Sequence, residues 1–345
     1  MFTVTKEQVA SILRDFGMAS EVAEFTELQR SHYEKDDPDS KEVRLITKVG
    51  LENGKQLVVR FKNEEDVTLE IIDAQSRFAR LLAEHGVETP TVYAANGQYA
   101  RWYALNGYDV IVMVEDFVPG EVRAVDAGIA EKTGGLLARM HNIAENADFH
   151  VRNDVLFDPL KANDLFSFED FEAQKDVLSS LDKALYDDIV RRHEELLQRV
   201  RVFENEPRYA VQGDISDCNL YQTDDGAIGV FDFNRCGDNV LYYDAIMQAI
   251  FEARLMVYAE ELAGKQEEII LSAFLKGYHR ERPFTEQQIE VFPYLYAIVS
   301  AFWLMDIRYA ENNLINSIKA GKADAAHAWM EEIQKRLTNH KRMPL

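Results

Sequence analysis

The sequence predicts an α+β protein with two lobes, in which a mainly antiparallel sheet comes first and helices follow. Two apolar stretches, residues 43–49 and 56–61, flank the turn-forming segment ENGK at residues 52–55, which pairs them as antiparallel strands. Beyond Gly120, apolar residues recur mostly at helical spacing. A chain of 345 residues is also long enough to form two lobes, each with its own core.

The first lobe is expected to span residues 1–114 and to end in a hinge at residues 115–120. Thr5 can cap a first helix and Gly17 can end it, because apolar residues recur between them at helical spacing. The expected elements of this lobe are helices at residues 5–17 and 69–85 and strands at residues 24–33, 43–49, 56–61, 92–95 and 108–114.

The second lobe is expected to span residues 121–345 and to be largely helical. Thr285 opens one helix with the capping-box pattern Thr-Glu-Gln-Gln. Pairs of Arg and Glu at i,i+3 and i,i+4 spacing in residues 181–204 indicate a solvated helix face. The expected helices cover residues 129–143, 168–175, 181–204, 243–262, 265–280, 285–308 and 322–337.

Composition limits the partners and the location of the chain. A formal net charge of −22 argues against nucleic acid as a partner, because its phosphates would be repelled. The charge permits a cationic small molecule, although acidity also serves solubility alone. The longest uncharged apolar run, residues 291–305, contains Pro293 and is too short to span a membrane. No signal peptide opens the chain, so we expect a cytoplasmic protein without a membrane partner.

The two cysteines, Cys218 and Cys236, lack CxxC or histidine spacing. This argues against a disulfide or a zinc site and favours small side chains that fill space. The sequence leaves the oligomeric state open.

The stretch VQGDISDCNLYQTDDGAIGVFD, residues 211–232, carries the clearest chemistry. Asp225-Gly226 is the kind of dipeptide that supplies positive φ at both positions of a two-residue hairpin turn. With that turn, Asn219 lies directly opposite Asp232, and opposed Cβ atoms are ~4.5–5.5 Å apart. A converging amide oxygen and carboxylate suit a hard cation such as Mg²⁺, which is usually held by one or two carboxylates and by substrate phosphates. Asp214 precedes Asn219 by five residues.

This stretch and its continuation resemble the signature of a known family. The segments QGDISDCNLYQ and GVFDFNRCGDNVLYYD are similar to the HGDLHxxN, IDFD and GDPxYDL segments of the aminoglycoside phosphotransferase and choline kinase-like family. The resemblance implies a protein-kinase-like fold in which Asp214 is catalytic and accepts a hydroxyl proton. It also implies that Asn219 and Asp232 bind the metal.

Three positions depart from the family signature. Gln212 and Ser216 replace its two histidines, and Asn234 replaces the second acid after the metal-binding aspartate. Asp214, Asn219 and Asp232 all match the carboxylate and carboxamide positions of the signature, which in the family accept the proton and bind the metal. The departures therefore concern the support of the loops more than the chemistry.

Further segments extend the resemblance towards the N-terminus. QLVVRF is similar to the family strand that ends in a phosphate-binding cation, which implies that role for Arg60. Gln75 stands where the family has a glutamate that pairs with this cation, so the partner of Arg60 is either Gln75, through a hydrogen bond, or Glu70. EDFVPGE resembles the family hinge, whose backbone groups bond the edge of adenine, and the residues that it places there are Glu115, Asp116 and Phe117.

The resemblance implies transfer of the γ-phosphate of ATP, with Mg²⁺, to a hydroxyl of a small molecule of the aminoglycoside, choline, homoserine or amino-sugar type. The loop at residues 33–40 would lie over the ATP phosphates, but it contains no glycine and four carboxylates. Such a loop is unsuited to close backbone approach to a polyphosphate. With Gln75 and Gln212, it motivates an alternative: a catalytically degenerate kinase-like protein that binds a nucleotide or a regulatory partner.

Several residues that invite a functional interpretation are expected to be structural. His141 lies on a core-facing helix, so we expect it to be buried and hydrogen-bonded to the backbone of the loop around Asp214. Asp244 is expected to brace the same loop. The aromatic residues expected to pack in the core, and not to form a cage for an organic cation, are Tyr294, Tyr296, Phe302, Trp303 and Tyr309.

Overall fold

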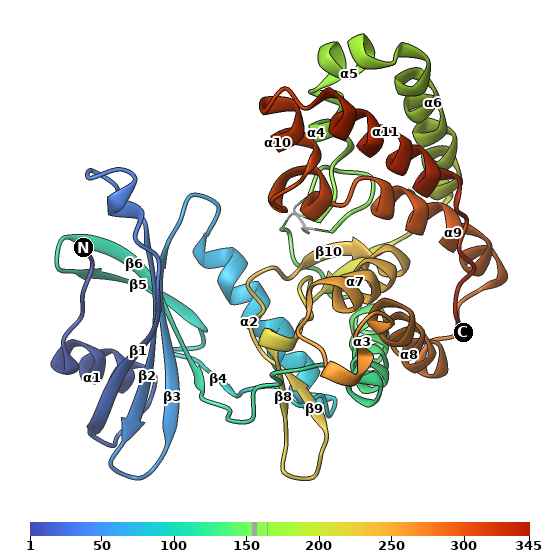
Figure 1. Cartoon of the computed structure of the whole chain (residues 1–345). Coiled ribbons are helices and arrows are strands. Elements are labelled where there is room, and N and C mark those ends of the chain that lie inside the picture. The colour runs from blue at the N-terminus through green and yellow to red at the C-terminus, as the bar shows by residue number, and fades with distance from the viewer. Residues whose placement is uncertain (154–156, 164) are drawn as a thin grey trace.

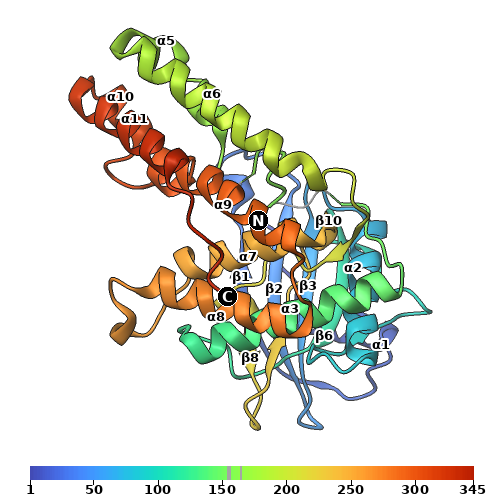
Figure 2. The same cartoon turned by 90° about the vertical axis from the view of Figure 1, so that its right-hand side faces the viewer.

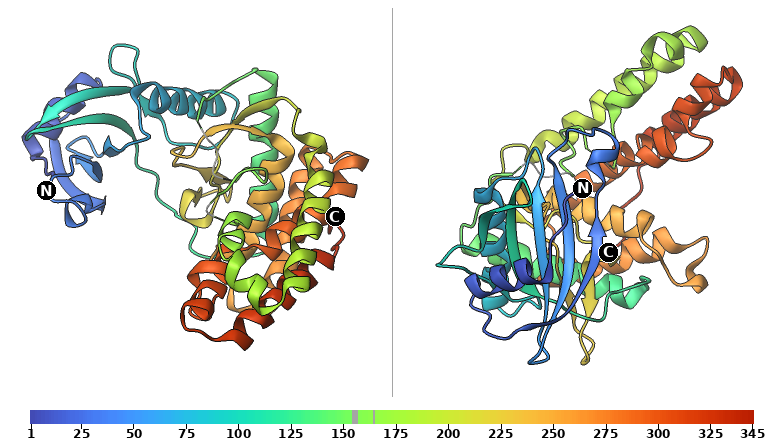
Figure 3. Two further views of the ribbon diagram at one scale, coloured as in Figure 1. Left: turned by 90° about the horizontal axis from the view of Figure 1, so that it is seen from above. Right: turned by 90° about the vertical axis from the view of Figure 1, so that its left-hand side faces the viewer.

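The computed structural model describes residues 1–153, 157–163 and 165–345, which form two lobes (Figure 1). A sheet dominates the N-terminal lobe, and helices dominate the C-terminal lobe. Viewed from above, the sheet, helix α1 (Lys6–Asp15) and helix α2 (Leu69–Glu84) lie on one side and the remaining helices lie on the other (Figure 3). The predicted α+β architecture with two lobes is confirmed.

The N-lobe sheet is antiparallel throughout, with strand order β1-β2-β3-β6-β4, and β5 also pairs with β6. The predicted turn at residues 52–55 connects β2 and β3, and Gly54 in it has a φ of 84°. The strands are β1 (Val22–Arg30), β2 (Val43–Leu51), β3 (Gln56–Asn63), β4 (Val92–Tyr93), β5 (Ala100–Leu105) and β6 (Tyr108–Asp116).

The two faces of β2 and β3 have different partners, as the period of two along a strand requires. One face is apolar, and Val49 and Phe61 on it are buried with Val9 of helix α1 (Lys6–Asp15). Thr5 caps α1 through the predicted type of hydrogen bond, within a capping box. The opposite face, which carries Arg60 and alternate residues on either side of it, looks towards the C-lobe.

One strand of the N-lobe, β5, was not predicted. β5 and β6 form a hairpin around Asn106-Gly107, whose φ values of 54° and 84° are those of a type I′ turn. Asn-Gly between two strands is the strongest short-range hairpin signal, so this strand was within reach of sequence analysis.

The C-lobe contains most of the predicted helices. Two short helices, α5 and α10, were not predicted, nor was the pairing of β7 (Arg208–Val211) with β10 (Gly237–Val240). The helices are α3 (Ala127–Asn146), α4 (Phe168–Glu172), α5 (Lys175–Leu181), α6 (Lys183–Val200), α7 (Leu241–Leu255), α8 (Gln266–Glu281), α9 (Glu286–Ala301), α10 (Leu314–Lys319) and α11 (Ala323–Thr338).

Helix α7 is the central helix of the C-lobe and is buried along most of its length. Helix α3 packs against α8, and α7 also contacts α8. Helices α5 and α6 with α10 and α11 project from this centre as an arm (Figure 2). No helix in the described part of the chain is both long and apolar enough to cross a bilayer.

Candidate active site

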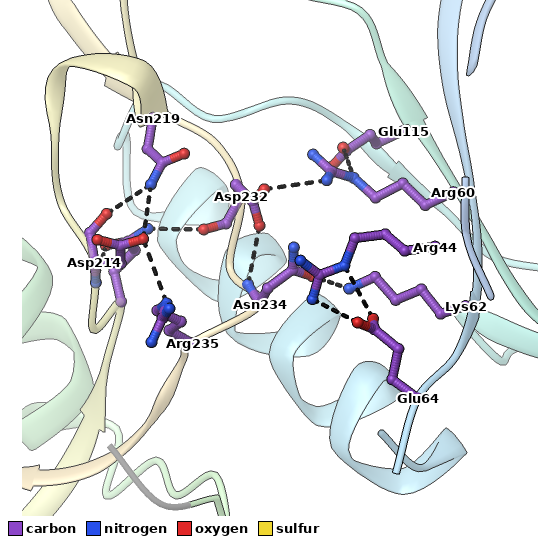
Figure 4. Close-up of polar contacts among 11 residues, drawn as sticks. Arg44, Arg60, Lys62, Glu64, Glu115, Asp214, Asn219, Asp232, Asn234 and Arg235 are labelled. Atoms are coloured by element: carbon purple, nitrogen blue, oxygen red, sulfur yellow. Dashed lines mark hydrogen bonds and ion pairs between the residues drawn. The ribbon is translucent and has the colours of Figure 1, made fainter. Parts of the chain in front are cut away.

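The loops after β7 and β9 (Ile228–Val230) face the N-lobe and carry the predicted catalytic and metal-binding residues (Figure 4). Asp214 follows β7, Asn219 precedes β8 (Leu220–Gln222), and Asp232 follows β9. Where the lobes meet there is a cavity of about 20 Å³. Four predicted site residues line this cavity together: Arg60, Gln75, Glu115 and Asp232.

The β8–β9 hairpin differs from its predicted register by one residue. The N–H of Thr223 donates to the carbonyl of Ala227 at 3.0 Å, so the loop has three residues, of which only Gly226 has a positive φ, of 81°. The Thr223 hydroxyl accepts the N–H of Ala227 at 3.0 Å and supports this longer loop. The carbonyl of Asn219 therefore accepts a hydrogen bond from the N–H of Phe231 at 3.0 Å. The predicted two-residue turn, and the direct opposition of Asn219 and Asp232, are wrong.

Asp214 and Asn219 form one hydrogen-bonded unit. The Nδ2 group of Asn219 donates to the main-chain carbonyl of Asp214 at 2.8 Å and to its Oδ2 at 3.3 Å. The Oδ1 of Asn219 is consequently turned away from Asp214, as Figure 4 shows. Nε of Arg235, which the sequence analysis did not select, lies 3.6 Å from Oδ2 of Asp214. The Asp214 side chain is 25% exposed, so a hydroxyl group can reach it.

Gln212 connects the two loops of the site. Its Oε1 accepts the N–H of Asp214 at 2.8 Å, and its Nε2 donates to the carbonyl of Asp232 at 2.7 Å. The side chain is buried, so both contacts are shielded from water. Although Gln212 differs from the histidine of the resembled signature, it therefore supports both loops.

Asp232 has a backbone φ of 59°, which is uncommon for a residue other than glycine and occurs frequently at functional sites. Its Oδ1 accepts the N–H of Asn234 at 3.2 Å, and its Oδ2 accepts Nη1 of Arg60 at 3.1 Å. Burial raises the pKa of Asp232, but the charges of Arg60 and Lys62 outweigh burial and lower the pKa overall. Asp232 is therefore ionised at neutral pH.

Arg60 is held by Glu115 and Asp232. Its Nε donates to Oε1 of Glu115 at 2.8 Å, and both side chains are buried. Burial lowers the pKa of Arg60, but the two carboxylates more than compensate and raise it overall. The predicted partners are wrong: the Nε2 of Gln75 donates instead to the carbonyls of Asn234 at 2.9 Å and Cys236 at 3.2 Å. Glu115 lies on the strand beside Arg60, and a cross-strand contact of this kind cannot be read from a helix motif.

A row of cations on β2 and β3 faces the C-lobe, and most of it was missed by the sequence analysis. In the strand register Arg44 is directly opposite Lys62, and Lys48 is opposite Val58. Residues at i and i+2 share a face, so these side chains lie on the face of Arg60. Burial, followed by the charge of Arg60, lowers the pKa of Lys62 to about 8. The alternation of QLVVRFK contained the signal for Lys62, since it is two residues from Arg60.

The predicted hinge residues Glu115, Asp116 and Phe117 lie at the end of β6 and just after it. The N–H of Asp116 donates to the carbonyl of Thr91 at 2.9 Å, and the N–H of Phe117 donates to that of Gln56 at 3.0 Å. These two amides are therefore engaged in the sheet, and the Glu115 side chain is engaged with Arg60. Their role towards adenine stays a prediction.

A chain of buried hydrogen bonds supports the loop that carries Asp214. Gln248 accepts the N–H of Ile215 at 3.1 Å and donates to Asp244 at 3.2 Å. His141 contacts Asp244 at 3.0 Å and the hydroxyl of Tyr278 at 2.9 Å. His141 is buried as predicted, but its expected contact with the loop backbone is wrong, because Gln248 makes that contact. Asp244 braces the loop, as predicted, through Gln248.

The C-lobe aromatic residues are mostly core, as predicted. Tyr296, Phe302 and Trp303 are buried, and Tyr294 is packed at the edge of the same core. The guanidinium of Arg254 lies over the rings of Tyr296, at 5.3 Å, and Trp303, at 5.1 Å. These two rings therefore already bind a cation of the chain itself. Tyr309 is 57% exposed, so the prediction that it packs in the core is wrong.

The donor set around Asn219 and Asp232 fits a hard cation. Asn219 offers an amide oxygen directed away from Asp214, and Asp232 offers an ionised carboxylate. Across the described residues, no group of three or more His, Cys, Asp or Glu side chains forms a metal site. Mg²⁺ is usually held by one or two carboxylates and completes its coordination with water and phosphate oxygens, so a site for it needs few protein ligands.

The sequence profile of the phosphotransferase enzyme family matches residues 43–284, most of the chain and all of the residues described above around the cleft. The chain belongs to this family. It is therefore a phosphotransferase. A search of curated proteins finds no matching sequence.

Among the solved structures that share the fold of this phosphotransferase, two are similar over most of the chain. One is the amicoumacin kinase hAmiN in complex with AMP-PNP, Ca²⁺ and Ami, at 16% identity and a TM-score of 0.58, with 86% of this chain and 87% of that chain covered. The other is a microcompartment-associated aminopropanol kinase, at 15% identity and a TM-score of 0.56, with 95% and 99% covered. At these identities the likeness concerns the fold, and it confirms the predicted protein-kinase-like class.

Proposed function

We propose that this phosphotransferase transfers the γ-phosphoryl group of ATP, with Mg²⁺, to a hydroxyl group of a small molecule. The observation that carries the proposal is the row of cations that includes Arg44, Arg60 and Lys62, which faces the loops of Asp214, Asn219 and Asp232 (Figure 4). In a chain with a net charge of −22, cations gathered on one sheet face provide a site for a polyanion. Catalysis of phosphoryl transfer is mainly positioning and charge neutralisation, which such a row provides.

Each residue of the site has a separate role in this proposal. Asp214 orients the acceptor hydroxyl and accepts its proton as the new oxygen–phosphorus bond forms and ADP leaves. Asn219 and Asp232 would hold Mg²⁺, whose charge offsets that of the phosphates. Arg60 would contribute a planar guanidinium that can bind two phosphate oxygens.

Arg60 spans the places where nucleotide and metal would bind. Its Nη1 lies 3.1 Å from Oδ2 of Asp232, the residue that would hold the metal ion together with Asn219. A cation bound to Asp232 would compete with this ion pair, since like charges repel across a few ångströms. We therefore propose that Arg60 turns from Asp232 towards phosphate while Glu115 continues to hold its Nε.

The alternative, a kinase-like protein that binds nucleotide without transferring phosphate, is supported by the loop at residues 33–40. The site opposes this alternative, because Gln212 ties Asp214 to the Asp232 loop and Asn219 binds Asp214. A protein that only binds nucleotide has no chemical need for a base held in this way.

Acceptors to test are amino alcohols and amino sugars, since the net charge permits cationic substrates and the two solved structures above are of kinases named for amicoumacin and aminopropanol. The experiment measures ADP release from MgATP with a panel of aminoglycosides, choline, homoserine, aminopropanol and amino sugars. Acceptor-dependent ADP release from at least one class is the expected result. Nucleotide binding without such release from any acceptor would favour the non-catalytic alternative.

A further inference from the structure

Lys62 is a buried cation whose nearest charged neighbours are already paired. Its side chain is 3% exposed, and its ammonium donates to Oδ1 of Asn234, which is neutral. The carboxylates that act on its charge belong to two ion pairs, Asp232 with Arg60 and Glu64 with Arg44. A buried ammonium with an amide as its partner is costly unless an anion joins it. The position of Lys62 therefore suits a bound anion.

Asn234 is fixed so that it can orient Lys62. Its N–H donates to Oδ1 of Asp232 at 3.2 Å, and its carbonyl accepts Nε2 of Gln75 at 2.9 Å. An amide oxygen holds the ammonium in place without neutralising it, which a carboxylate at this position would do. An ammonium has three donors and Asn234 accepts one of those of Lys62, so the ammonium can also donate to phosphate oxygens.

The loop at residues 33–40 uses its own amides internally. The N–H groups of Asp36 and Asp37 both donate to the carbonyl of Tyr33 at 3.1 Å, and that of Lys35 donates to His32 at 3.0 Å. These amides are not directed at a ligand. A glycine-free loop folded in this way does not offer the nest of N–H groups that binds phosphate elsewhere.

The same loop is attached to the row of cations by a side chain. The hydroxyl of Tyr33 donates to Glu64, and Glu64 pairs with Arg44 at 2.8 Å. Arg44 is in turn directly opposite Lys62 on the paired strand. The loop thus holds side chains of the sheet in position through Tyr33, while its backbone N–H groups donate to carbonyls of the same segment.

We propose that Lys62, oriented by Asn234, is a phosphate-binding residue of this protein and that side chains of β2 and β3 replace the backbone of the 33–40 loop in holding the nucleotide phosphates. The ligand is a nucleoside di- or triphosphate. This inference rests on the proposed function, because it assigns the phosphate contacts within the same site.

The first test is Lys62→Gln, which removes the charge and retains a hydrogen-bonding side chain of similar size. We expect calorimetric titrations to show ATP and ADP binding weakened about 10- to 100-fold, as is typical for loss of a charged hydrogen bond. Adenosine and AMP binding should change less than twofold. Equal ATP affinity in the native and variant proteins, or an equal loss for adenosine and ATP, would overturn the proposal.

The second test is Asn234→Asp, which separates this role from that of a metal ligand. A carboxylate would neutralise Lys62 and repel phosphate, so we expect MgATP binding to weaken about tenfold or more at fixed Mg²⁺. If residue 234 bound metal instead, the added carboxylate would strengthen MgATP binding and lower the Mg²⁺ concentration needed. That opposite sign would contradict the inference, and it remains measurable if Lys62→Gln fails to fold.

Lys175→Gln, an exposed lysine on α5 in the helical arm, is the matched control and should bind ATP as the native chain does. Different results would contradict the proposed reaction and the proposed role of Lys62. Absence of acceptor-dependent ADP release by the native chain counts against the proposed reaction. Unchanged ATP binding in Lys62→Gln counts against Lys62 alone.

Discussion

Asp214, the proposed proton acceptor, has a side chain that is 25% exposed and that accepts a hydrogen bond from Asn219. In Asp214→Asn the side chain can no longer accept a proton, whereas Asn219 can still donate to the main-chain carbonyl of residue 214. We expect kcat to fall by roughly 10²–10⁴-fold, the usual contribution of general base catalysis, with little change in MgATP binding. Steady-state ADP release and calorimetry measure the two quantities. Asp224→Asn, in the exposed hairpin turn, is the control, and unchanged turnover in Asp214→Asn would remove Asp214 from the reaction.

His193 on α6 makes folding stability depend on pH. It is 8% exposed and stacks on Phe168 with ring centroids 3.9 Å apart. Burial lowers its pKa to about 4, whereas an unfolded histidine has a pKa of about 6.5. Between these pH values the unfolded chain binds more protons than the folded chain. The contribution of neutral His193 to the free energy of unfolding is therefore fully present above about pH 6.5 and is lost as the pH falls towards 4.

We expect the free energy of unfolding to decrease by about 2 kcal/mol between pH 7 and pH 5 because of His193 alone. Urea unfolding at the two pH values, in the native chain and in His193→Gln, isolates this contribution. The variant should lose stability less steeply than the native chain. The same slope in both proteins would show that His193 is not the group responsible.

At the scale of single residues, sequence patterns identified the groups whose chemistry is carried by a short motif. Asp214, Asn219 and Asp232 were selected in this way, and the structure places them on adjacent loops. The strand alternation contained a signal for the position of Lys62, but the partners of Lys62 and the role of Glu115 depend on contacts between segments far apart in the chain. The contact between Lys62 and Asn234, for example, joins residues separated by 172 positions.

Gly213 and Gly226 have similar backbone conformations but differ in the space that their surroundings leave for a side chain. Gly213 has a φ of 84°, and a Cβ added there would lie 2.4 Å from the carbonyl oxygen of Arg235. Gly226 has a φ of 81°, but its added Cβ would meet no atom closer than 3.8 Å. Gly226→Ala should therefore cost only the backbone strain of about 1 kcal/mol, whereas Gly213→Ala should cost more and displace the catalytic loop.

Thermal or urea unfolding of the two alanine variants, with ADP release, tests this difference. Gly226→Ala should retain most of the activity, since the added Cβ would meet no atom closer than 3.8 Å and would leave the neighbouring strands in place. Gly213→Ala should lose both stability and turnover. Equal effects of the two substitutions would contradict the close approach of residue 213 to the backbone of Arg235.

At the scale of elements, periodicity was sufficient for long helices and for strands with clear alternation. It failed for α5, α10, β7 and β10, which are seven residues or fewer and therefore too short to show a clear period. It also failed in the β8–β9 hairpin, where the side chain of Thr223 selected a three-residue loop over the two-residue turn expected for Asp-Gly. A slip of one residue moves each side chain of a strand to the opposite face of the sheet.

At the scale of the whole molecule, the fold class was predictable because motifs spaced over most of the chain agreed with one architecture. The identity of the phosphate acceptor was not predictable, because the helix patterns in the C-lobe indicate which side chains pack in the core and not which side chains face a bound molecule. The distribution of charge also becomes visible only in three dimensions. A chain with a net charge of −22 places a row of cations on the sheet face opposite its catalytic loop.

Ligand binding should stabilise both lobes together, because polar contacts such as Arg60 with Asp232 and Gln75 with Asn234 join them across the cleft. At a free MgATP concentration of 100 times its Kd, we expect about 2.7 kcal/mol of added stability, which thermal unfolding detects as an increase in Tm. Chelation of Mg²⁺ with EDTA should reduce this increase, because Asp232 would then return to Arg60. Adenosine at the same concentration should stabilise much less, since it cannot contact the cations of β2 and β3. Equal stabilisation by adenosine and MgATP would mean that the sheet face does not bind phosphate.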